Sequence, residues 1–167
     1  AMDAPECLRM ADVDGDGDLD LLSASDGDDG ISWWDNVQGD GSVWAEHRIS
    51  GLVQQHKELL AHDMDEDGDL DVISTSQDTD DVIWWSNDQG DGLSWSEHVI
   101  DSHFGNAQAI AVADLDGDGD SDILGGGSGV HGLGWWDLQS SAFSSWSKGF
   151  ISGSFSGDAG IQLADMD

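Results

Sequence analysis

Positive charge is the scarcest feature of this sequence. Its 167 residues include four Lys and Arg against 36 Asp and Glu, which gives a formal net charge of −32. Without a basic patch the chain has nothing to neutralise the phosphates of a nucleic acid, and the same charge disfavours anionic membrane surfaces. We therefore expect no nucleic-acid partner. A charge this negative suits a calcium-rich or saline medium, where cations screen the repulsion.

Other absences narrow the fold class. Cys7 is the only cysteine, which excludes an intrachain disulfide. No apolar run approaches the ~18 residues of a membrane span, and no segment shows the helical period of about 3.6. Neither a nucleophile elbow nor a zinc motif is present. The 23 glycines indicate many tight turns. We expect an all-β protein that does not span a membrane and is not an enzyme.

An acidic nine-residue motif organises the chain. It occupies Asp12–Asp20, Asp63–Asp71 and Asp114–Asp122, and successive copies begin 51 residues apart. A fourth copy begins at Asp165 and the sequence ends two residues later. The period divides the chain into three repeats and the start of a fourth: residues 4–54, 55–105, 106–156 and 157–167.

Carboxylates this close repel one another, and none of the four Lys and Arg lies inside a motif. A hard divalent cation relieves the repulsion, and calcium takes six to eight oxygen ligands. We expect one calcium per motif, three in all. The side chains at positions 1, 3, 5 and 9 would bind it: Asp12, Asp14, Asp16, Asp20; Asp63, Asp65, Asp67, Asp71; Asp114, Asp116, Asp118, Asp122. Position 7 (Asp18, Asp69, Asp120) would offer its backbone carbonyl, and a glycine at position 6 (Gly17, Gly68, Gly119) permits the turn.

The motif opens like an EF-hand loop but departs from it at position 12. An EF-hand carries a bidentate Glu there, between two helices. Here position 12 is Ser23, Ser74 or Gly125, and the flanks alternate as strands. The alternative to a metal site is a set of solvated acidic turns. Three copies in register favour the metal.

Four short strands are predicted in each repeat. The first precedes the acidic loop, the second leaves it, the third carries a Trp pair and the fourth begins at a further Trp. The predicted strands are 7–11, 21–25, 31–36 and 44–50; 58–62, 72–76, 82–87 and 95–101; 110–113, 123–127, 133–138 and 146–152; and 161–164, the first strand of a fourth repeat. All nine Trp recur with the period. Four strands per ~50 residues is typical of propeller blades.

The pattern Asp-x-Asp-x-Asp-Gly-Asp-x-Asp after an Ala-containing strand resembles the FG-GAP or VCBS-type repeat of integrin α-subunit propellers and many secreted bacterial proteins. It is also similar to the calcium-binding blades of some fungal propeller lectins. The resemblance covers residues 4–167 and implies a calcium-binding β-propeller outside the cell. It does not specify a ligand.

Family propellers have six or seven blades, whereas this chain has three and the start of a fourth. Either the chain is a piece of a longer protein or copies assemble, and two chains would give six blades. The segment 161–164 duplicates 7–11 and is also able to exchange between chains as a closing strand.

Ligand candidates are the Trp pairs and two histidines. One face of each third strand must be core, and the other is available to present an indole to a sugar: Trp34, Trp85 and Trp136. His47 and His98 recur on the fourth strand, and the third repeat lacks them. Purely structural roles are the alternative for both sets. Gly125–Gly129 predicts a loose strand and loop.

Three functional hypotheses follow. The first is a lectin-like module that recognises carbohydrate or glycoprotein. The second is a structural or adhesion repeat of a larger secreted protein, with protein partners and no sugar site. The third, an enzyme, has no support in the sequence.

Overall fold

A computed structural model describes residues 5–25, 30–50, 56–127, 132–139, 145–152 and 161. Over these residues the chain forms twelve β-strands, and no helix there is long and apolar enough to cross a membrane. The strands are β1 (Pro5–Ala11), β2 (Asp20–Ser25), β3 (Ile31–Asp35), β4 (Ala45–Arg48), β5 (His56–His62), β6 (Asp71–Ser76), β7 (Asp81–Asn87), β8 (Trp95–Asp101), β9 (Ala107–Ala113), β10 (Asp122–Gly127), β11 (Leu133–Leu138) and β12 (Trp146–Ser152).

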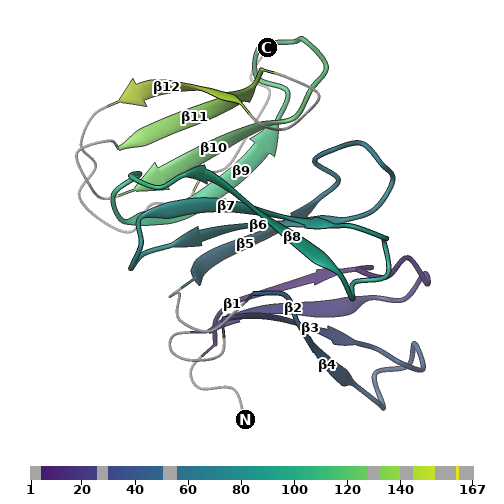
Figure 1. Ribbon diagram of the computed structural model, residues 1–167. Coiled ribbons are helices and arrows are strands. Elements are labelled where there is room, and N and C mark those ends of the chain that lie inside the picture. Colours follow the sequence, from purple (N-terminus) through teal and green to yellow (C-terminus); the bar gives the residue numbers. More distant parts are fainter. Residues whose placement is uncertain are drawn as a thin grey trace.

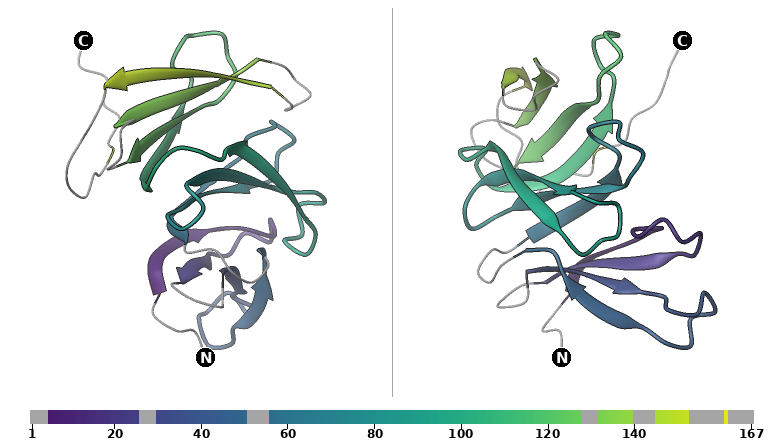
Figure 2. Two further views of the ribbon diagram at one scale, coloured as in Figure 1. Left: turned by 60° about the vertical axis from the view of Figure 1, so that its left-hand side comes forward. Right: turned by 45° about the vertical axis from the view of Figure 1, so that its right-hand side comes forward.

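Each repeat folds into one four-stranded antiparallel sheet whose strands lie in chain order. We call β1–β4 sheet 1, β5–β8 sheet 2 and β9–β12 sheet 3. The three sheets stack face to face like successive blades of a propeller, with sheet 2 in the middle (Figures 1 and 2). The prediction of an all-β propeller-like fold with four-stranded blades is confirmed.

Strand boundaries agree with the sequence pattern to within three residues, with β4 shortened to Ala45–Arg48 and the first strand of each sheet beginning two or three residues earlier than predicted. Of the predicted strand 161–164, only Ile161 is described, and it lies outside any strand. The remainder of that segment falls outside the described residues.

Two rows of paired side chains cross each sheet, one on either face. In sheet 1 the row Arg9–Leu22–Trp33–His47 faces sheet 2, and the row Met10–Leu21–Trp34–Glu46 lies on the opposite face. We call these the first-Trp row and the second-Trp row. The corresponding first-Trp rows are Leu60–Ile73–Trp84–His98 in sheet 2 and Ala111–Leu124–Trp135–Gly149 in sheet 3; the second-Trp rows are Ala61–Val72–Trp85–Glu97 and Val112–Ile123–Trp136–Lys148.

The core lies at the two junctions between sheets. At the first junction, Trp33 and Leu22 of sheet 1 pack with Val72 and Trp85 of sheet 2. At the second, a cluster of the same kind joins Trp84 to Trp136. Both junctions therefore pair the first-Trp row of one sheet with the second-Trp row of the next. This regularity follows from the 51-residue period, because equivalent residues occupy equivalent places.

The glycine-rich segment of β10 is part of the second junction. The prediction of a loose strand is wrong for Gly125–Gly127, which are paired and buried in the sheet. A Cβ on Gly125 would lie 2.6 Å from the Trp136 ring, and a Cβ on Gly134 would lie 2.8 Å from Phe104. The glycines thus make room for Phe104, which is fully buried and meets Trp136 edge to face at 4.8 Å.

His56, at the start of β5, is fully buried, and neither ring nitrogen has a hydrogen-bond partner among the described residues. Burial lowers the pKa of His56 from 6.5 to about 4. Between pH 6.5 and pH 4, His56 is therefore protonated in the unfolded chain but remains neutral in the folded chain. The free energy of unfolding should fall by about 3 kcal/mol as the pH drops through that window.

We expect His56→Leu to remove this part of the pH dependence, measured by urea unfolding at pH 7 and pH 4.5. His103→Ala serves as the control, because His103 is exposed. An unchanged pH slope in His56→Leu would contradict the assignment.

Candidate metal centres

Each acidic loop brings three carboxylates together at the end of its sheet. The oxygens of the residues at positions 1, 3 and 9 lie within 4.8 Å of one another in all three loops: Asp12, Asp14, Asp20; Asp63, Asp65, Asp71; Asp114, Asp116, Asp122. We call these groups the loop triads. Twelve side-chain ligands were predicted, and the structure brings nine of them into the triads.

The last residue of each triad fixes the loop to the sheet. Asp71 is 1% exposed, and its two oxygens accept hydrogen bonds from the Met64 N–H at 3.0 Å and the Asn87 N–H at 2.9 Å. Asp20 accepts in the same way from Val13 and Asn36. One carboxylate therefore joins the start of the loop to the end of the third strand and still directs oxygen toward the loop centre.

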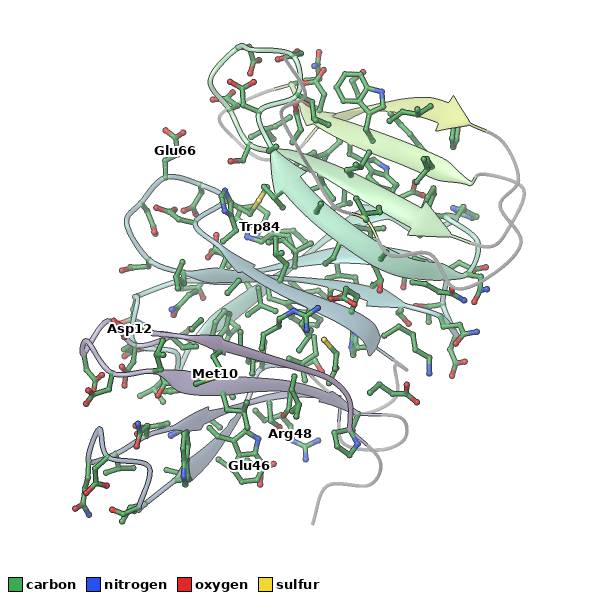
Figure 3. The ribbon with its side chains drawn as sticks, turned by 180° about the vertical axis from the view of Figure 1, so that it is seen from behind. Met10, Asp12, Glu46, Arg48, Glu66 and Trp84 are labelled. Atoms are coloured by element: carbon green, nitrogen blue, oxygen red, sulfur yellow. The ribbon has the colours of Figure 1, made fainter. Side chains whose placement is uncertain are left out.

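The sharp turn uses the predicted glycines. Gly17, Gly68 and Gly119 have φ values of 96°, 101° and 102°, a region that favours glycine. Their N–H groups donate to the first aspartate of each loop, as Gly68 does to Asp63 at 3.0 Å. In loop 2, Glu66 takes φ 59° where the other loops have glycine, and its side chain points out from the loop tip (Figure 3).

Positions 5 and 7 play other parts in loops 1 and 2. Asp16 and Asp67 are exposed and stand outside the triads, and each accepts a hydrogen bond from the N–H two residues on, at 2.9 Å. The side chains of Asp18 and Asp69 turn toward Gly39 and Gly90 of the β3–β4 and β7–β8 hairpins. That orientation is consistent with the expectation that position 7 offers its carbonyl and not its carboxylate.

Loop 3 has an acidic neighbour that sequence reasoning missed. Asp137, at the end of β11, forms a further group with Asp116 and Asp118, again with oxygens within 4.8 Å. Its counterpart Asp35 raises the pKa of Asp14 and Asp20 through its charge, after the larger effect of burial. The sequence contains a pattern that could have indicated this residue: an aspartate follows the Trp pair in repeats 1 and 3, whereas Ser86 follows it in repeat 2.

The electrostatics of the loops fit a divalent cation. Burial raises the pKa of Asp71 to about 6 and also raises that of Asp20, Asp65 and Asp122. Charged carboxylates there are therefore costly without a cation, and protons compete with it below about pH 6.

Three basic side chains among the described residues do not neutralise the loop carboxylates, because they pair elsewhere. Arg9, Lys57 and Lys148 pair with Glu58, Glu6 and Asp101, all outside the loops. Asp12 Oδ1 is buried and accepts no hydrogen bond from the part of the chain that the structure describes. A hard cation with oxygen ligands satisfies such a group.

The loops also reach into the junctions. The second residue of each of the first two loops, Val13 or Met64, is 2% exposed and packs in the core between its sheet and the next. Asn87 Nδ2 of sheet 2 donates to the Val13 carbonyl at 3.1 Å, and His62 Nε2 lies 2.9 Å from Ser121 Oγ of loop 3. Loop order and sheet packing are therefore coupled.

The predicted indole platforms need a correction. Trp85 is 4% exposed and Trp136 is 1% exposed, because the preceding sheet covers each of them. Neither presents an indole face to a ligand. Trp34 is half-buried on the uncovered face of sheet 1, and its Nε1 donates to Ser23 Oγ at 3.1 Å.

His47 and His98 lie at the rims of the two junctions. Each is half-buried and stacked on the first Trp of its sheet, at 4.6 Å from Trp33 and 4.4 Å from Trp84. His47 Nε2 is also 4.0 Å from Asp35 Oδ2.

A tryptophan from the next sheet joins each rim. Trp33 Nε1 and Trp95 Nε1 donate to the same Gly92 carbonyl, at 2.8 and 2.7 Å. Trp95 is half-buried and packs against the first junction, and Trp146 does the same at the second. Sequence reasoning did not select Trp95 and Trp146, although both recur with the period.

Comparison with known proteins supports the fold and the repeat. Residues 63–125 match the FG-GAP-like repeat family, so the predicted FG-GAP-type repeat is confirmed over that segment. It extends from loop 2 to the middle of β10, slightly more than one period. No curated protein matches the sequence.

A solved structure shares the architecture. An Agrocybe aegerita lectin, described as specifically recognising non-reducing terminal N-acetylglucosamine, matches with a TM-score of 0.51 and 20% sequence identity. The match covers 78% of this chain and 34% of the lectin chain, so this chain spans about a third of that protein. At this identity the likeness concerns the fold.

Proposed function

We propose that this chain is a calcium-stabilised, extracellular propeller module that binds carbohydrate. The calcium part of the proposal is supported by the three loop triads, which gather carboxylates that Arg9, Lys57 and Lys148 do not neutralise. Calcium would be held by the triad carboxylates and would supply positive charge there. Extracellular fluids supply calcium at concentrations suited to such sites, which agrees with a chain this acidic.

The observation that carries the carbohydrate part is the pairing of aromatic and polar groups at each rim. At the first rim, Trp95 shares the Gly92 carbonyl with Trp33, on which His47 stacks. At the second rim, Trp146 packs against the cluster that contains Trp84, on which His98 stacks. Indole faces pack against the apolar faces of sugars. A carboxylate accepts hydrogen bonds from sugar hydroxyls, and a neutral imidazole accepts with one ring nitrogen and donates with the other. Asp35 adds such an acceptor at the first rim. The match to an N-acetylglucosamine-binding lectin suggests the first sugar to try.

The test is sugar binding by calorimetry and on a glycan array, in calcium, beginning with N-acetylglucosamine-terminated glycans. We expect two sites per chain, because Gly149 replaces the rim histidine in the third repeat. His47→Ala and His98→Ala should each weaken one site about tenfold, the effect of losing one good hydrogen bond. His103→Ala, at an exposed position that belongs to neither rim set, should bind normally.

A blank array from protein that is folded and calcium-loaded would refute carbohydrate binding. It would leave the structural or adhesion repeat, with protein partners, as the remaining function. Binding that survives in both histidine variants would refute the rim assignment alone.

A further inference from the structure

The two filled junctions show which surface fits which. Each pairs a first-Trp row with a second-Trp row: Trp33 of sheet 1 meets Trp85 of sheet 2, and Trp84 of sheet 2 lies in one cluster with Trp136 of sheet 3. The acidic loops follow the same arrangement: Val13 of loop 1 and Met64 of loop 2 each pack in the junction with the following sheet. Leu70, the eighth residue of loop 2, packs toward the preceding sheet.

No strand among the described residues covers the second-Trp row of sheet 1. On this face Met10 is 64% exposed and Leu8 is 49% exposed, and Trp34 is half-buried between them and the fourth strand. Met10, Glu46 and Arg48 lie together on the side of sheet 1 turned away from sheet 2 (Figure 3). Leu19, the counterpart of Leu70 in loop 1, is 53% exposed.

Among the described residues, sheet 3 leaves only part of its first-Trp row open. Trp135 is half-buried, whereas Ala111 and Leu124 are buried. Trp135, Leu115 and Ile151 line a hollow of about 270 Å³ on this face. Ile151 is 60% exposed, and Leu115, the counterpart of Val13 and Met64, is 41% exposed where they are 2% exposed. The two open faces are thus the two halves of one junction.

We propose that a second copy of this chain covers both faces. Sheet 3 of one copy packs on sheet 1 of the other, as sheet 1 packs on sheet 2 within the chain, and the reverse contact closes the ring. The contact is head-to-tail and occurs twice about a two-fold axis. Six blades result. In both internal junctions a first-Trp row packs on a second-Trp row. A second copy of this chain offers each open face the row that it lacks.

Ile161 adds a requirement to this assembly. It corresponds by the 51-residue period to Leu8, Leu59 and Ile110, and its Cδ1 lies 3.2 Å from where a Cβ on Gly126 would be, on the open face of sheet 3. Leu8 of the second copy would take the same place. The second copy therefore displaces Ile161, and Ile161→Asp should increase the dimer fraction.

The experiment measures mass by light scattering after gel filtration, in calcium and 0.15 M salt to screen the net charge. The chain of 17.7 kDa should elute at twice that mass. Met10→Asp breaks one face and Ile151→Asp breaks the other, and both side chains are more than half exposed in the single chain, so folding should be retained. Each variant alone should be monomeric. Leu93→Asp, at an exposed hairpin position, should remain dimeric.

Mixing Met10→Asp with Ile151→Asp leaves one intact junction between the two chains and should restore part of the dimer. A wild-type monomer at high concentration would overturn the proposal. So would a dimer broken by only one of the two variants, because that result indicates like faces in contact. Loss of the dimer in Ile161→Asp would place Ile161 in the interface and overturn the head-to-tail register.

Discussion

Removal of calcium is expected to lower the free energy of unfolding by about 8 kcal/mol. With free calcium at about 100 times each dissociation constant, a site that exists only in the folded chain contributes about 2.7 kcal/mol, and the three loop triads would provide three such sites. The loss should be large because each empty loop holds carboxylates within 4.8 Å of one another. Because Val13 and Met64 pack in the core between sheets, disorder in loops 1 and 2 would also weaken the junctions. Thermal unfolding with calcium and with EDTA measures the effect.

Single substitutions distinguish the loss of a calcium ligand from the mere removal of one negative charge. Asp12→Ala removes one member of the first triad and should reduce the calcium stoichiometry from three to two by calorimetry. Asp78→Ala removes an exposed carboxylate in the β6–β7 turn, away from every triad, and should leave three ions bound. Equal stoichiometry in the two variants would contradict the ligand assignment, and an unchanged melting curve in EDTA would contradict the structural role of calcium.

The strands and the loops were predictable because they depend on local sequence. The apolar run Val82–Trp85, between polar residues on either side, predicted a strand at 82–87 without knowledge of its neighbours, and β7 spans Asp81–Asn87. Likewise, the first and third residues of loop 2, Asp63 and Asp65, are two positions apart, so a tight turn alone brings their oxygens together. The repeat supplied independent evidence, since any feature true of one copy had to hold for the others.

Burial of the second Trp was not predictable, because it depends on which sheets have neighbours. Trp34, Trp85 and Trp136 have the same local sequence context, yet only Trp34 lies on an uncovered face. Likewise, Asp137 reaches loop 3 through the pairing of β11 beside β10, a contact that joins residues about twenty positions apart. In the glycine-rich segment, the missing information was the position of Phe104, which fills the space that the absent side chains leave.

The tryptophans of sheet 1 give the sharpest test of the row arrangement, because adjacent residues face opposite ways. Trp33 is 1% exposed and its Nε1 donates to the Gly92 carbonyl of sheet 2 at 2.8 Å. Trp33→Ala should therefore cost 3–5 kcal/mol, about the loss typical of a buried Trp. Trp34→Ala removes an equal volume from the uncovered face and should cost about 1 kcal/mol.

Urea unfolding in calcium, at protein concentrations low enough to keep the chain monomeric, compares the two variants. The difference should disappear at higher concentration if Trp34 becomes buried between copies, because its loss then also weakens the contact between sheet 1 and the second chain. Equal costs in the monomer would show that both faces of sheet 1 are covered within one chain, and would remove the open face on which the head-to-tail assembly depends.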